Sequence, residues 1–155
     1  MYICVVKLYR INNKPYLKLR SIATLIDYGI FFLLSWLYTD GFGTKQNDGS
    51  TVMYGLPALV VPTFWLLYFV GLETINQATP GHDICKLKVY KTDGYKLSLT
   101  DAFKRRICDI FDIMMYGIPA FIAISKTEKH QRLGDLLANT VVAKKSDVIE
   151  TEVIF

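Results

Sequence analysis

The chain has 155 residues, of which 52% are hydrophobic and 14% aromatic, and it carries a formal net charge of +4. This length allows one domain. A domain of this size cannot hide two wholly apolar helices from solvent, which argues against a soluble helical bundle. The cations gather beside apolar blocks, which argues against nucleic-acid binding and favours contacts with lipid headgroups.

The N-terminal segment, residues 1–19, is predicted to be a basic arm on the cytoplasmic side of a membrane. Residues 1–20 contain no acid and the following cations: Lys7, Arg10, Lys14, Lys18 and Arg20. Such a segment stays in the cytoplasm by the positive-inside rule. A long basic arm ahead of the first apolar block also argues against a cleavable signal peptide.

The first apolar block runs from Ser21 to Tyr38 and is interrupted only by Asp27. In a helix, Arg20, Ala23 and Asp27 share one stripe. An ionisable side chain inside a membrane span costs roughly 3 kcal/mol or more, so it faces protein or water and has a partner. Because Arg20 and Asp27 lie about 10 Å apart along the axis, each is expected to find its partner elsewhere in the fold.

The second apolar block, residues 52–72, contains no charged residue. Both blocks match the roughly 20 helical residues that cross a hydrocarbon core, so they predict two transmembrane helices. The connection between them, residues 39–51, holds two acids and one lysine. The positive-inside rule therefore places this connection outside the cytoplasm.

The third apolar block, residues 107–125, contains Asp109 and Asp112 and has basic residues on both sides. Residues 73–106 carry seven cations against four acids, and further cations follow residue 125. The positive-inside rule therefore places both flanks in the cytoplasm.

A break in this third block explains how both flanks can lie on one side. Gly117 permits a turn, and Pro119 removes a backbone hydrogen bond. We predict two short helices, 107–116 and 119–125, that enter the membrane and return. The alternative is one proline-kinked crossing.

Polar segments on either side of the third block are β-prone. Lys86–Tyr90 alternates polar and apolar residues, and Thr92–Gly94 gives a turn before Tyr95–Leu97. Thr140–Ala143 is also β-prone. These segments can form a small cytoplasmic sheet only if they lie on the same side of the membrane, which agrees with a returning block. Between them, Arg132–Ala138 predicts a short helix or turn.

Several short motifs occur in a fixed order along the chain. They are Arg20 and Asp27, Glu73, Thr79-Pro80-Gly81, Leu87-Lys88-Val89, Asp93-Gly94, Lys104-Arg105-Arg106 and Asp135 within Arg132-Leu-Gly-Asp-Leu-Leu-Ala-Asn-Thr-Val-Val142. In this order and spacing they resemble the RDD family of small bacterial membrane proteins, which is named for one arginine and two aspartates. His82 stands where the family usually has lysine, and Gly134 stands where it usually has histidine.

The resemblance covers about residues 20–143 and implies a fold and a location. It implies a multi-pass protein of the bacterial cytoplasmic (inner) membrane with a cytoplasmic N-terminus, and a loosely defined link to transport. The expected organisation is the arm 1–19, an RDD-like membrane domain over 20–145, and a polar C-terminal tail over 146–155. The implied signature residues are Arg20, Asp27 and Asp135.

The acids of the third block have two open roles. In a helix, Asp109 follows Arg105 by four residues and precedes Asp112 by three, so the three share a face. In one role, cations at the membrane edge clamp Asp27, Asp109 or Asp112 and fix the helix packing. In the other, these acids line a hydrated cavity for a cation or proton. The candidate partners or ion-site residues are Glu73, Arg105, Arg106, Asp109 and Asp112.

No catalytic, metal or cofactor site is predicted, because the cysteines are scattered and no phosphate-loop or nucleophile motif is present.

The predicted fold class is an all-α integral membrane protein with two transmembrane helices, a broken third helical block and a small cytoplasmic β element. We predict a non-enzymatic adaptor or assembly component of a membrane complex. Its expected partners are the lipid bilayer and a second copy or another membrane protein. The alternative is a small oligomeric transporter or cation/proton exchanger that uses intramembrane aspartates.

Overall fold

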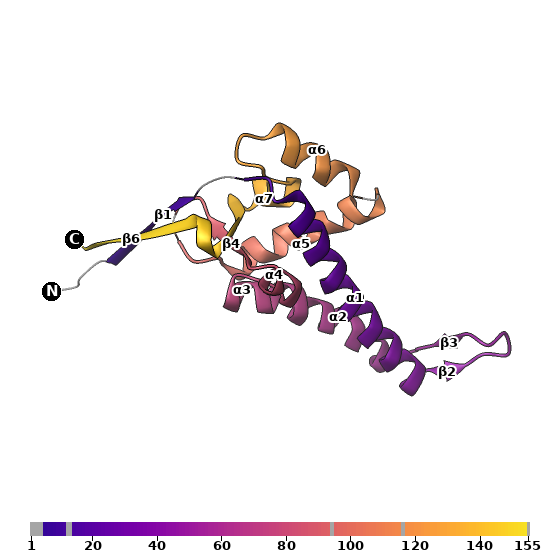
Figure 1. The fold of residues 1–155 in the computed structure, drawn as a ribbon. Helices are drawn as coiled ribbons and strands as arrows, with labels where there is room; N and C mark the ends of the chain where they lie inside the picture. The colour runs from indigo at the N-terminus through magenta and orange to yellow at the C-terminus, as the bar shows by residue number, and fades with distance from the viewer. Residues whose placement is uncertain (1–4, 12–13, 94, 116, 155) are drawn as a thin grey trace.

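The computed structural model describes residues 5–11, 14–93, 95–115 and 117–154. Two long helices form its centre, shorter helices and the strand pair β4–β5 pack beside them, and the two other strand pairs lie at the ends (Figure 1). The hairpin of β2 and β3 lies at one end of the molecule, and the strands β1 and β6 lie at the other (Figure 1).

Helix α1 spans Leu17–Phe42, about one turn more at each end than the apolar block Ser21–Tyr38. It buries the stripe Arg20, Ala23, Asp27 and Phe31, which follows the helical repeat. Much of its remaining apolar surface, including Phe32 and Trp36, is exposed. The helix therefore uses one narrow face to contact the rest of the protein.

The second long helix is a continuous rod from Leu56 to Asn76. It begins as the 3-10 turn η1 (Leu56–Leu59), continues as α2 (Val60–Trp65) and the π-helical stretch η2 (Leu66–Gly71), and ends as α3 (Leu72–Asn76). Both long helices, of 26 and 21 residues, are long and apolar enough to cross a membrane, which confirms the expectation of two such helices.

A short hairpin connects the two long helices. Its strands are β2 (Thr44–Lys45) and β3 (Thr51–Val52), which pair antiparallel. Asp48 accepts hydrogen bonds from the backbone and hydroxyl of Ser50 and so stabilises the turn.

Helix α4 (Pro80–Ile84) lies directly against α1. Pro80 is its first residue, where a missing N–H does no harm. A Cβ added to Gly81 would lie 2.3 Å from the carbonyl oxygen of Ala23. Small residues on both helices therefore permit this close contact.

The third apolar block forms two helices, α5 (Leu99–Met114) and α6 (Ile118–Lys126). Gly117 separates them with a φ of 77°, which glycine adopts without strain. Helix α5 begins earlier than the predicted residue 107. Ser98 and Asp101 bond to each other's backbone N–H groups and start the helix there.

The two segments predicted to form a sheet do pair. Strand β4 (Leu87–Lys91) runs antiparallel to β5 (Thr140–Lys144), and the short helix α7 (Leu133–Leu137) precedes β5. The prediction of a strand at Tyr95–Leu97 was wrong, because β4 pairs with β5 instead.

A further pair of strands was not predicted. Strand β1 (Val5–Ile11) pairs antiparallel with β6 (Val148–Ile154), and a 3-10 turn, η3 (Lys145–Asp147), connects β5 to β6. These strands lie in the segments described above as the arm and the tail.

The apolar core joins the β4–β5 pair to the long helices. Leu87, Val89 and Val142 of the sheet pack with Ala23 of α1 and Val70 of η2. A second cluster joins Phe31 of α1 to Tyr68 and Phe69 of η2. The interior between these elements is where the charged residues meet.

Candidate functional site

A network of buried charged residues connects α1, α3, α5 and α7. Each member is less than one tenth exposed. The members are Arg20, Glu73, Arg105, Arg106, Asp109, Arg132 and Asp135. Charges so deeply buried persist only when they are paired and hydrogen-bonded.

Asp135 is the point where α1 and α5 meet α7. It binds Arg20 of α1 and Arg105 of α5. Burial opposes its ionisation, but the nearby Arg105, Arg20 and Arg132 outweigh this and hold the pKa of Asp135 well below its usual range. Arg132 also reaches Asp135 in α7's capping box.

Gly134 lets α7 approach α5 closely enough for this contact. A Cβ at this position would lie 2.7 Å from the carbonyl oxygen of Arg105 and 3.2 Å from the Cβ of Cys108. The glycine found here in place of histidine therefore matches the close packing of the two helices.

Glu73 connects the second long helix to α5. Its Oε1 accepts from Nε of Arg105 at 2.6 Å, and its Oε2 accepts from Arg106. Arg106 also donates to Asp109 at 2.7 Å. The expected pair of Arg105 with Asp109 is not what the structure shows, because Arg105 points to Glu73 and Asp135 instead.

Asp27 lies apart from the arginines. Its Oδ1 accepts from the backbone N–H of Gly81 at 2.7 Å and faces the hydroxyl of Tyr68 at 3.4 Å. Its Oδ2 accepts from Thr79 Oγ1 at 2.5 Å and contacts Nδ1 of His82 at 3.0 Å. A carboxylate has about four acceptor positions, and all of these are occupied.

The hydrogen bonds also assign the tautomer of His82. Thr79 uses its one proton for Asp27, so its contact of 2.8 Å with Nδ1 of His82 needs a proton on that nitrogen. Burial lowers the pKa of His82, against the opposing effect of its bond to Asp27. A neutral imidazole therefore shares its one Nδ1 proton between Thr79 Oγ1 and Asp27 Oδ2. The clamp of Asp27 by cations at the membrane edge, one of the two roles left open by the sequence, is therefore not what the structure shows.

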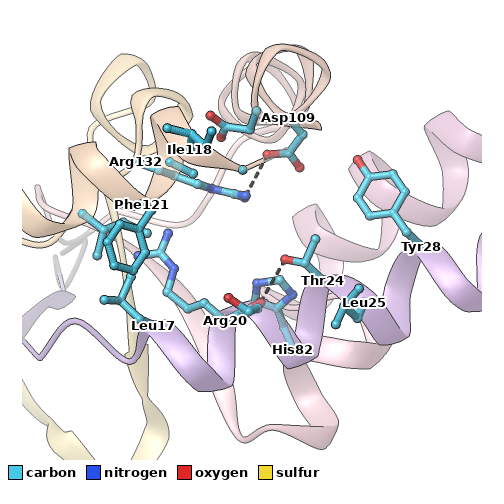
Figure 2. A pocket seen from close by; sticks show the side chains of 15 residues that line it. Leu17, Arg20, Thr24, Leu25, Tyr28, His82, Asp109, Ile118, Phe121 and Arg132 are labelled. Carbon is cyan, nitrogen blue, oxygen red and sulfur yellow. Dashed lines mark hydrogen bonds and ion pairs between the residues drawn. The ribbon is translucent and has the colours of Figure 1, made fainter. Parts of the chain in front are cut away.

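Beside the network lies a cavity of about 610 Å³. It is lined by residues of α1, α4, α5 and α6 and by Arg132 before α7, and Figure 2 shows Leu17 and Phe121 at one end and Tyr28 at the other. The ion pair between Arg132 and Asp109, with 2.8 Å between Nη1 and Oδ1, forms part of its wall (Figure 2).

Asp112 also lines this cavity, and it differs from the other buried acids. It is 6% exposed, yet its Oδ2 has no hydrogen-bond partner among the residues that the structure describes. Burial raises the pKa of Asp112, as do Asp109 and Asp135, while Arg132 opposes them. The predicted clamp therefore includes Asp109 but leaves Asp112 out.

The structure thus brings together the sequence-predicted residues Arg20, Glu73, Arg105, Arg106, Asp109 and Asp135, and it leaves Asp27 and Asp112 outside the ion pairs of this network. Sequence reasoning missed Arg132, whose spacing to Asp135 matches a capping box. It also missed Thr79 and His82 as partners of Asp27. In the described part of the chain, no group of three His, Cys, Asp or Glu residues is arranged to hold a metal ion.

Comparison with known proteins gives two findings. The profile of the RDD family matches residues 15–139. An uncharacterized protein of Bacillus subtilis (strain 168), YckC, is 30% identical over 132 residues, which cover 77% of this chain and 78% of the relative. No solved structure matches the chain.

Proposed function

Because this chain belongs to the RDD family, we propose that it is a non-enzymatic, multi-pass protein of the bacterial cytoplasmic membrane. In this proposal it acts as a structural or adaptor component of a membrane complex. Family membership suggests a membrane protein, and the two long apolar helices support that location. The contacts of the buried acids support the structural or adaptor role.

The saturation of Asp27 is the observation that carries the proposal. A transport site must bind and release its ion, and for this it needs acceptor positions that exchange partners. The carboxylate of Asp27 in the first long helix already accepts from Gly81, Thr79, His82 and Tyr68. Its contacts join α1 to α4 and to the second long helix, so Asp27 stabilises the packing of these helices.

The charged network supports the same role. Breaking a buried ion pair by removing one partner costs about 3–5 kcal/mol. Glu73 binds two arginines and Asp135 binds three, and together they connect α1, α3, α5 and α7. A rigid assembly of this kind presents constant outer surfaces to other molecules.

Those outer surfaces supply the contact area for partners. On α1 the exposed residues include Phe32, Leu33 and Trp36, and on the second helix they include Leu59 and Leu67. Lipid covers such surfaces in a bilayer, and a second copy or another membrane protein can do so equally well.

Strand pairing supports a topology in which only the β2–β3 connection faces out. Two crossings, by α1 and the second helix, bring the chain back to the side of its N-terminus. Because β4 pairs with β5, the intervening α5 and α6 must begin and end on that side. The pairing of β1 with β6 supports the same side for the C-terminal strand.

Cysteine labelling tests this topology in intact cells. In a chain whose native cysteines are replaced by serine, an impermeant maleimide should modify Asn47→Cys and miss Lys129→Cys. Permeabilised cells provide the control, since both sites should then react. Strong labelling of Lys129→Cys from outside would contradict the returning third block.

Reconstitution separates an adaptor from an exchanger. Purified chain in vesicles with a pH-sensitive dye should give no more cation-driven proton flux than empty vesicles. Native mass spectrometry of the chain extracted in mild detergent should show a second copy or a defined membrane protein in fixed ratio. Flux that disappears in Asp27→Asn, and persists in the control Asp40→Asn on the exposed end of α1, would favour the exchanger.

A further inference from the structure

The cavity beside the charged network combines an apolar wall with a charged one. Leu17, Ile118 and Phe121 provide apolar surface, while Asp112 and Arg132 provide charge. Its volume of about 610 Å³ lies within the range of small-molecule sites in proteins. Pockets for amphiphiles need this division between an apolar and a polar part.

Two buried residues of opposite charge, Asp112 and Arg132, line the cavity, and each has a polar atom without a hydrogen-bond partner in the part of the chain that the structure describes. Oδ2 of Asp112 and Nη2 of Arg132 have no hydrogen-bond partner within the described ranges of the chain. Their residues are 6% and 8% exposed. A buried polar atom without a partner costs about 1–3 kcal/mol, and more when it is charged. Both atoms are closed to solvent in the structure, so a ligand that donates to Asp112 and accepts from Arg132 removes this cost once the two side chains turn toward the cavity.

The charge balance favours a zwitterion. Among the residues that line the cavity, two arginines (Arg20 and Arg132) face two acids (Asp109 and Asp112), and His82 is neutral. The site is therefore neutral as a whole. A lone cation or anion would leave an uncompensated charge behind, whereas a zwitterion matches both groups.

The missing bonds also define the cationic end of the ligand. Oδ2 of Asp112 needs a hydrogen-bond donor. A primary ammonium has three N–H donors, whereas a quaternary ammonium has none. At the anionic end, a phosphate suits the guanidinium fork of Arg132.

We propose that this cavity binds an ethanolamine-phosphate headgroup, with its ammonium on Asp112, its phosphate on Arg132 and its acyl chains along the apolar wall. Exposed Ile118 and Phe121 of α6 continue that wall to the outer surface, so a lipid can enter from the bilayer. The proposal rests on the membrane location proposed above, and it does not depend on the adaptor role.

Lipid titration of the purified chain in detergent tests this inference. Native mass spectrometry measures the bound fraction for phosphatidylethanolamine, phosphatidylcholine and free phosphoethanolamine. We expect phosphatidylethanolamine to bind at least tenfold more tightly than phosphatidylcholine, which corresponds to one charge-assisted hydrogen bond of about 1.4 kcal/mol or more. Free phosphoethanolamine should bind far more weakly, because it lacks the apolar contacts.

Two variants locate the site. Asp112→Asn should reduce binding of phosphatidylethanolamine by about tenfold, and Ala120→Phe should reduce it by filling the cavity without changing a charge. Asp83→Asn, an exposed position on α4, is the matched control and should bind normally. Circular dichroism and the thermal midpoint verify that each variant is folded.

Several outcomes would overturn the inference. Equal binding of the two lipids, or unchanged binding in both folded cavity variants, would remove the headgroup site. Free phosphoethanolamine that binds as tightly as the lipid would assign the site to a soluble ligand instead. A chain that stays in aqueous solution without detergent would overturn the membrane location, which is a separate failure.

Discussion

Replacement of Asp27 by leucine tests whether this acid anchors α4 to α1. Leucine removes the acceptor for the backbone N–H of Gly81, which is buried and bonded at 2.7 Å. Thr79 and His82, which lie 2.8 Å apart, keep the hydrogen bond that they already make to each other. The contact to Tyr68, at 3.4 Å, is long and contributes little.

The magnitude follows from the donors that have no second partner. One buried N–H left unpaired costs about 1–3 kcal/mol, and the lost charge-assisted bond from Thr79 adds about 1 kcal/mol or more. We therefore expect Asp27→Leu to lower the free energy of unfolding by about 2–4 kcal/mol. Asp27→Asn keeps one acceptor oxygen for Gly81 and should cost about half as much.

Titration with sodium dodecyl sulfate from a mild detergent, followed by circular dichroism, measures the unfolding free energy of each variant. Asp40→Asn on the exposed end of the same helix is the control, with an expected change within about 0.5 kcal/mol. Wild-type stability of both Asp27 variants would refute the anchoring role. A larger loss for asparagine than for leucine would refute the reasoning from unpaired donors.

Other expected outcomes can be measured by the same titration. Arg105→Lys should cost about 2–4 kcal/mol, because one ammonium cannot replace the guanidinium that binds both Glu73 and Asp135; a fully stable variant would contradict this. Gly134→Ala should cost about 1–3 kcal/mol by forcing α7 away from α5, and unchanged stability would show that the helices can adjust. The pKa of Asp135 is lower in the folded state, so its stabilisation is present above about pH 4 and should be lost as pH falls through the folded value. The pKa of Asp112 is instead raised in the folded state, so its ionisation at neutral pH lowers the stability of the fold. Asp112→Asn should therefore leave stability at neutral pH unchanged or higher. A marked loss of stability would mean that the carboxylate has a stabilising partner.

Local patterns in the sequence predict much of the fold. Continuous apolar runs indicate the two long helices, and Gly117 with Pro119 indicates the break between α5 and α6. Alternation of apolar and polar residues around Val89 indicates strand β4. In each case the sequence pattern lies within the same residues that form the predicted helix, break or strand.

The contacts of the site depend on residues far apart in the chain, and local patterns do not contain them. Thr79 and His82 reach Asp27 across more than 50 positions because the five-residue helix α4 turns them inward. A helix so short shows no periodicity. The helical stripe indicates that Asp27 and Arg20 face inward, but it does not indicate which donors or acids meet them.

The long separation in sequence between Asp135 and its arginines has a consequence for biosynthesis. Arg20 is made with α1 and Arg105 with α5, yet the acid that both bind is synthesised 115 residues after Arg20. Until α7 leaves the ribosome, these two guanidinium groups have no access to it. The contact of α1 with α7 therefore forms only after α7 has been made, and a chain interrupted before that point leaves Arg20 without its carboxylate partner.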